Sequence, residues 1–251
     1  MLAPLDLGDA QSGSLLGRSS PLVKLGLAIA WLVGLALTLE PGPPLVLAAV
    51  ALAAGLMLGG IPPVRLARAL APLVLAAASM AVTNLLFAAA NTDPASTELA
   101  RIGPLRLTAE AAEAAAALAA RVLAIVSVGA VFVQTTDPTR LVDSLVWQGR
   151  LPERFAYGAL AAYQAVPRLG EDLATLRGAR RIRGLGGSWH PRLLVGLLVR
   201  AIRHADQLAL AMDARAFGSG PRTTYRPIRR GWPDAVVGIG GLVALALIVL
   251  W

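Results

Sequence analysis

The sequence predicts an all-α, polytopic membrane protein with about five transmembrane helices and a cytoplasmic pair of arginine-tipped helices. The first indication is composition: 56% of the 251 residues are hydrophobic and only 15% are charged, whereas soluble domains average about 25% charged residues. The second is a series of five apolar segments. The third is a positive charge confined to one stretch between the last two of them.

Each apolar segment approaches the length of a membrane-spanning helix, which needs about 20 mostly apolar residues. Five such segments in one chain favour membrane spans over the buried helices of a soluble protein. Only the second and the last are short enough to question. Because the first 17 residues lack basic residues, we expect no cleavable signal peptide. The segments are residues 22–39, 43–59, 70–90, 111–134 and 235–251.

The positive charge lies in residues 171–230, where 12 arginines against four acidic residues account for the whole net charge of +8. Cytoplasmic loops of membrane proteins carry an excess of Lys and Arg. This rule predicts that the N-terminus, the 60–69 loop and residues 135–232 are cytoplasmic. The 91–110 loop and the C-terminal Trp251 then face outward.

The chain is therefore expected to have three parts. These are residues 1–134 with transmembrane helices 1–4, the cytoplasmic region 135–232, and the C-terminal transmembrane helix 233–251. Residues 153–169 are apolar but too short to favour a span. A span there would also move the arginine-rich stretch outside, so we expect a helix along the cytoplasmic membrane face.

Two long helices are predicted within the basic region. The first begins near Glu153 or Leu169, and the second begins near Pro191, because proline is favoured in a first helical turn. They end beside Arg183 and Arg215, where glycines follow. A cation at a helix C-terminus complements the helix dipole by about 0.3–1 kcal/mol. The helix dipole explains each arginine separately, but it does not explain why two consecutive helices both end beside an arginine.

These helix ends resemble the paired Ala-Arg-Gly signatures of the T component (EcfT/CbiQ/BioN-like) of energy-coupling factor (ECF) transporters. The two blocks are Ala179-Arg-Arg-Ile-Arg183-Gly184 and Ala209-Leu-Ala-Met-Asp-Ala-Arg215-Ala-Phe-Gly218. Ile182 stands where the family has alanine and Ala216 where it has glycine, but both arginines are kept. The blocks Pro21–Leu25, Thr135–Val142 and Leu151–Tyr157 are similar to other family segments, so the resemblance covers nearly the whole chain in order.

The resemblance implies a non-catalytic scaffold of an ATP-driven importer in the bacterial inner membrane. Such a scaffold joins a substrate-binding S component in the membrane to two cytoplasmic ABC-type ATPases, for uptake of a vitamin or a transition-metal ion. Its partners would be these subunits and the lipid bilayer, with no nucleic acid. The implied ATPase-coupling residues are Arg183, Gly184, Ala214, Arg215 and Ala216, supported by Ala179, Arg180, Asp213 and Gly218.

Residue types absent from the chain exclude several chemistries. There is no cysteine, and histidine occurs only as His190 and His204, so thiolate and histidine metal cages are not expected. Lys24, the only lysine, is not preceded by the glycine-rich loop that binds phosphate in ATPases. We therefore expect no catalytic residue, no cofactor and no metal site, and an energy source in another chain.

Two alternatives stay open. A self-contained permease would show polar groups inside its spans, and Arg121 is the deep candidate, expected near the outer end of the fourth span or facing a helix interior. A membrane enzyme would need clustered acids, and Asp206 and Asp213 share a helix face. We interpret these acids instead as ion-pair partners near Arg203 and Arg215. His204 is expected to be an ordinary interface residue.

Nucleic acid and lipid are the other possible partners of an arginine cluster. Few aromatic residues accompany the arginines, so base stacking is not supported. Contact with anionic lipid headgroups fits basic residues next to membrane spans as a secondary role.

Overall fold

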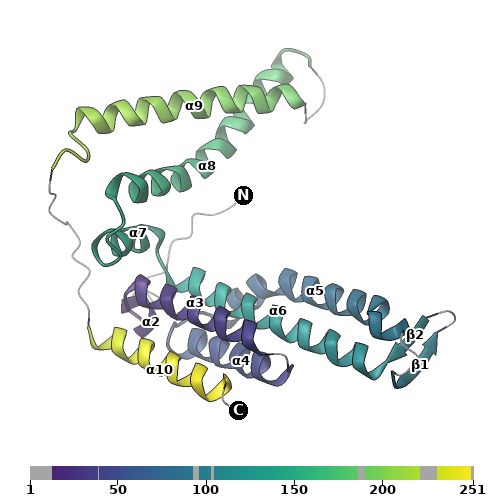
Figure 1. Ribbon diagram of the computed structural model, residues 1–251. Coiled ribbons are helices and arrows are strands. Elements are labelled where there is room, and N and C mark those ends of the chain that lie inside the picture. Colours follow the sequence, from purple (N-terminus) through teal and green to yellow (C-terminus); the bar gives the residue numbers. More distant parts are fainter. Residues whose placement is uncertain are drawn as a thin grey trace. The chain divides into compact units, whose positions relative to one another are not determined.

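The computed structural model describes residues 13–38, 40–92, 96–102, 105–185, 190–220 and 231–249 (Figure 1). The chain forms two compact units. The apolar unit takes in Asp6–Leu141 and Arg229–Trp251, and the basic unit is built from Val142–Ile228. The predicted membrane and cytoplasmic segments, 1–134, 135–232 and 233–251, concern topology and stay predictions.

Five helices of the apolar unit overlap the five predicted apolar segments, and the short α2 precedes them. Proline occupies the first turn of α3, α4 and α5, where its missing N–H leaves no hydrogen bond unmade and its fixed φ is already helical. The bounds are α2 (Leu15–Arg18), α3 (Pro21–Leu37), α4 (Gly42–Met57), α5 (Pro63–Phe87), α6 (Ala109–Thr135) and α10 (Trp232–Val249).

The helices fall into two length classes. In the described part of the chain, α5 and α6 are long and apolar enough to cross a membrane, whereas α3, α4 and α10 are shorter apolar helices. At a rise of about 1.5 Å per residue, the 16 residues of α4 extend roughly 24 Å. The helix at the first predicted span, residues 22–39, is α3. It ends earlier than expected, at Leu37, because the backbone of Thr38 is extended.

The core of the apolar unit lies where α3, α4, α6 and α10 meet. Small residues allow this close packing. A Cβ on Gly55 of α4 would lie 2.7 Å from a methyl carbon of Val131 on α6, so only glycine fits there. The buried cluster comprises Trp31, Leu35, Leu47, Ala48, Ala51, Ala124, Val128 and Ile248.

The far ends of α5 and α6 carry a small β-hairpin, which the sequence prediction missed. Figure 1 shows α5 and α6 side by side, extending past α3 and α4 to this hairpin. It consists of β1 (Glu98–Ile102) and the antiparallel β2 (Leu105–Thr108), preceded by the 3-10 turn η1 (Ala89–Thr92). The predicted 91–110 loop thus contains a two-stranded sheet, and the rest of the described chain is helical, as predicted.

The basic unit contains α8 (Glu153–Ile182), α9 (Pro191–Ala214) and the part of α7 (Pro138–Trp147) that follows Leu141. The prediction of two long helices here is confirmed. The first is one continuous helix from Glu153 through Pro167, which includes the apolar segment 153–169. The helices α8 and α9 are joined by polar contacts of Arg200 with Asp172 (2.6 Å) and of Arg168 with His204 (2.9 Å). His204 is therefore an interface residue, as expected.

Candidate functional site

The first arginine motif closes the C-terminus of α8. Arg183 is the capping residue, and Gly184 follows with a left-handed φ of +71°. The N–H of Leu185 donates to the carbonyl oxygen of Arg180 over 3.1 Å, and that of Gly184 donates to Arg181 over 3.1 Å. These two bonds define a Schellman motif, in which glycine is favoured because its φ is positive.

The second motif closes α9 with the same geometry. Arg215 is the capping residue, and Ala216 has a φ of +56°. The N–H of Phe217 donates to the carbonyl oxygen of Met212 over 3.0 Å, and that of Ala216 donates to Asp213 over 2.9 Å. The departure from glycine at residue 216 therefore leaves the motif intact. It costs about 1–2 kcal/mol, because a Cβ crowds the backbone in the left-handed region.

Both motif arginines are solvent-exposed. The described residues contain two ion pairs, Arg106–Glu98 and Arg200–Asp172. The expected pairing of Asp206 and Asp213 with the arginines near them is therefore wrong. For Asp213 and Arg215 the reason is that residues two apart on a helix do not face each other.

The two motifs are held differently. The Phe217 ring packs edge-on against Tyr157 of α8, with ring centroids 6.0 Å apart and planes at 82°. The Tyr157 hydroxyl donates to Asp143 of α7 over 2.8 Å. Gly218, with φ +75°, lies so close to Arg154 that a Cβ would be 2.6 Å from its Nε. The end of α9 is thus packed against the start of α8, which in turn is bonded to α7.

No comparable packing surrounds the first motif within the described residues. A Cβ on Gly184 would meet nothing within 4 Å, and Ile182 is 89% exposed. Because α8 and α9 run in opposite directions, the motifs lie at opposite ends of the helix pair (Figure 1). The structure therefore does not bring Arg183 and Arg215 together. It presents them as two separate tips.

The remaining predicted site residues serve these helix ends. Ala179 and Arg180 supply carbonyl oxygens that accept N–H groups of the first motif, and Asp213 does so in the second. Ala214 is the last residue of α9. Sequence reasoning missed the support from Asp143 and Tyr157, although Tyr157 lies in a block that carries the family resemblance.

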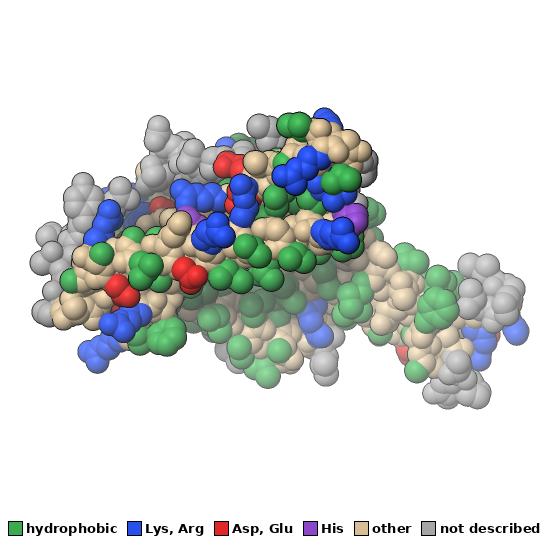
Figure 2. All heavy atoms as spheres, turned by 90° about the horizontal axis from the view of Figure 1, so that it is seen from above, with side chains coloured by type: hydrophobic (Ala, Val, Ile, Leu, Met, Phe, Trp, Pro, Cys, Tyr) green, Lys and Arg blue, Asp and Glu red, His purple; other side chains and the backbone are tan. Residues whose placement is uncertain are grey.

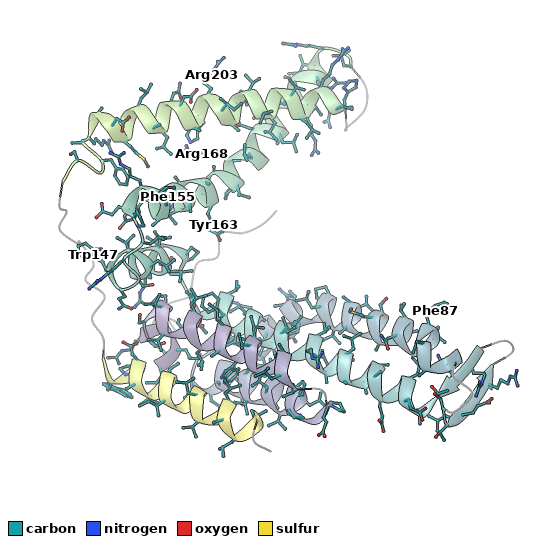
Figure 3. The ribbon with its side chains drawn as sticks, in the orientation of Figure 1. Phe87, Trp147, Phe155, Tyr163, Arg168 and Arg203 are labelled. Atoms are coloured by element: carbon teal, nitrogen blue, oxygen red, sulfur yellow. The ribbon has the colours of Figure 1, made fainter. Side chains whose placement is uncertain are left out.

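A cleft of about 760 Å³ separates parts of α8 and α9. Its polar lining includes Arg168, Arg203 and Asp172, with alanines between them (Figure 3). On the face of the basic unit seen in Figure 2, basic side chains are interspersed with hydrophobic ones. The described residues contain no group of three His, Cys, Asp or Glu side chains that could hold a metal ion.

The sequence matches the model of the CbiQ family, described as cobalt transport protein, over residues 12–225. The chain belongs to the CbiQ family. Both arginine motifs lie within the matched residues, whereas α10 lies beyond them. The resemblance to the T component of ECF transporters is thereby confirmed, and with it the assignment to a family of membrane transport proteins.

Relatives carry names consistent with the family. The chain is 32% identical over 168 residues to the energy-coupling factor transporter transmembrane protein EcfT of Heliobacterium modesticaldum, covering 60% of this chain and 63% of the relative. It is 28% identical over 165 residues to EcfT of Limosilactobacillus fermentum, covering 59% of each. A putative ABC transporter ATP-binding protein of Bifidobacterium longum is 25% identical over 205 residues, covering 75% of this chain and 25% of the relative. The chain thus spans from a quarter to about three fifths of these relatives' lengths.

Proposed function

We propose that this protein is the membrane scaffold and energy-coupling subunit of an ECF-type ABC importer. It links a substrate-binding S component to two cytoplasmic ATPases for uptake of a vitamin or a transition-metal ion. The observation that carries the proposal is the pair of matching helix ends, each capped by an exposed arginine. Two separate tips suit two copies of an ATPase, one for each tip.

Each tip has the chemistry of an interface anchor. An exposed guanidinium offers five N–H donors in a planar fork that matches carboxylates and backbone carbonyls. The helix behind it can lie in a groove of the partner, which is a common mode of recognition. ATP would be hydrolysed by the partner, because Lys24 is only 6% exposed and its Nζ is bonded to two carbonyl oxygens of this chain.

The membrane arrangement that we propose is that of the bacterial inner membrane, with the N-terminus and residues 135–232 in the cytoplasm. Trp251, proposed to lie outside, is not among the described residues. Phe87 on α5, labelled in Figure 3, is 76% exposed, and Leu247 on α10 is 67% exposed. Large exposed apolar side chains suit contact with lipid. Phe155, 75% exposed, supports a place for residues 153–169 at the membrane surface.

The permease alternative depends on Arg121, and its geometry favours the scaffold. Arg121 lies in the middle of α6 rather than near its outer end, and its Nη2 donates to the carbonyl oxygen of Thr38. This carbonyl belongs to the capping residue at the C-terminus of α3. A cation there satisfies a carbonyl that the helix itself leaves unpaired. Arg121 thus has a structural task within the apolar unit.

The experiment that tests the proposal replaces Arg183 or Arg215 by alanine in the complete transporter. Truncating one partner of a hydrogen-bonded charge at an interface costs roughly 2–5 kcal/mol, or about 30-fold or more in affinity. We expect either variant to insert normally but to lose co-purifying ATPase and uptake, with the double variant worst. Lysine should restore little, because it lacks the planar fork.

Matched controls are Arg177→Ala in α8 and Arg203→Ala in the middle of α9, both exposed arginines outside the two motifs. They should reduce ATPase association by less than about threefold, because exposed charges contribute about 0–1 kcal/mol. Equal losses at all four arginines would contradict the proposal, and would leave the helix dipole as the explanation of Arg183 and Arg215.

A further inference from the structure

In the sequence, Val142–Ile228 of the basic unit stands between Asp6–Leu141 and Arg229–Trp251 of the apolar unit, so two connections flank it. The chain leaves after α6, through residues 136–141, and returns at α10. If the proposed function is right, movement of the arginine-tipped helices reaches the apolar helices through these two connections. How firmly each connection is held therefore determines how much of that movement is transmitted.

The outgoing connection is fixed by two cations. Lys24 is buried near the start of α3, and its Nζ donates to the carbonyl oxygen of Thr135 at the end of α6 over 2.7 Å. The same Nζ donates to Leu16 over 2.9 Å. Arg140, beyond the end of α6, donates from its Nη1 to the carbonyl oxygen of Gly17 over 2.7 Å.

The returning connection is fixed by an acid. Asp234, in the first turn of α10, is 9% exposed, and its Oδ1 accepts the backbone N–H of Ser20. Its Oδ2 accepts the N–H of Gly231 over 3.0 Å. Ser20 immediately precedes α3 and is itself buried.

Both connections therefore meet the same short stretch, residues 16–24. The bonded partners are 111 residues apart for Lys24 and Thr135, and 214 apart for Ser20 and Asp234. A contact that served only to cap one helix end could be made by a residue nearby in the sequence, so these distant partners indicate a role beyond capping. Buried charged groups are also costly to leave unpaired, so each contact holds its connection in one position.

We propose that residues 16–24 act as a clasp that holds both connections against the start of α3. In this arrangement α3, α6 and α10 shift as one body when the arginine-tipped helices move. Lys24, Arg140 and Asp234 are positioning residues for coupling. The inference rests on the proposed function and extends it to the route by which movement enters the apolar unit.

The test compares Lys24→Met and Asp234→Ala in the complete transporter, reconstituted in membranes with its ATPases and S component. The matched control is Arg121→Met. Arg121 also joins α6 to a carbonyl oxygen of α3, but at the opposite end of α3 and away from both connections. We expect both clasp variants to keep ATPase association within about twofold. Uptake per ATP hydrolysed should fall about tenfold, a typical coupling between sites.

A second measurement separates positioning from general loss of structure. Amide hydrogen exchange reports local opening, so exchange at residues 137–141 should accelerate about tenfold in Lys24→Met and stay unchanged in Arg121→Met. An unchanged uptake-to-hydrolysis ratio in both clasp variants would overturn the inference, as would equal changes in Arg121→Met. If the unaltered chain does not associate with ATPases at all, the proposed function itself is wrong.

Discussion

Residues 184 and 216 occupy equivalent positions in the two arginine motifs, but one is glycine and the other is alanine. Their φ angles are +71° and +56°. Gly184→Ala should destabilise the end of α8 by about 1–2 kcal/mol, because a Cβ is crowded in the left-handed region. Ala216→Gly should relieve this strain in the folded protein. Because glycine also increases the flexibility of the unfolded chain, the net stabilisation of the end of α9 should be at most about 1 kcal/mol. Hydrogen exchange at the amides of Leu185 and Phe217 measures both effects.

Gly178 provides the control for this exchange of residues. It lies inside α8, and a Cβ there would meet nothing within 4 Å. Gly178→Ala should stabilise the helix by about 0.5–1 kcal/mol, because alanine loses less backbone freedom. Replacing glycine by alanine is thus expected to stabilise the helix at residue 178 and to destabilise it at residue 184. If both substitutions changed the stability in the same direction, the left-handed conformation would be absent from the first motif in solution.

At the residue scale, the local features of the site could be predicted from the sequence and the distant ones could not. An arginine beside a glycine marks a helix end within a few residues, so the place of Arg183 and Arg215 follows from local rules. Nothing local links Arg121 to Thr38, which is 83 residues away.

The ends of α8 and α9 differ as elements: the second tip is packed and the first is free. Phe217→Ala removes the edge-to-face contact with Tyr157, worth about 0.5–1.5 kcal/mol beyond burial. We expect a spin label at Ser219→Cys to become more mobile in this background. The chain has no native cysteine, so each label is unique.

Two comparisons make this measurement decisive. Tyr157→Phe keeps the ring and loses only the hydrogen bond to Asp143, so it should have a smaller effect, about 0.5–1.5 kcal/mol. A label at Leu185→Cys, on the first tip, should be mobile from the outset and indifferent to Phe217→Ala. Equal mobility of the two labels in the unaltered background would contradict the asymmetry between the tips.

The long elements were predictable because periodic apolar patterns and strong stop signals extend over many residues. The start of α9 at Pro191 is an example. The hairpin escaped prediction because its strands have only five and four residues. Its side-chain pair, Glu98 with Arg106 at 3.2 Å, joins the two strands and leaves no periodic pattern in either one.

At the scale of the whole molecule, the two units have opposite surfaces. The α5 and α10 helices expose apolar side chains, among them Leu75 and Ile239, at 73% and 64%. In the chain as a whole, the net charge of +8 comes from residues 171–230. Moving such a stretch across a bilayer would oppose the rule that basic segments stay in the cytoplasm. The loop of residues 91–110 that contains the hairpin has no such bias, since its two arginines are outnumbered by three acidic residues.

These properties predict opposite sides of the membrane for the hairpin and for α8. Leu99 in β1 is 63% exposed, and Thr175 in α8 is also exposed. In intact cells, a membrane-impermeant thiol reagent should label Leu99→Cys and spare Thr175→Cys, which should react only after the membrane is opened. Labelling of Thr175→Cys from outside would invert the arrangement. It would also remove both arginine tips from the compartment that holds ATP, so this one experiment tests the topology on which the coupling role depends.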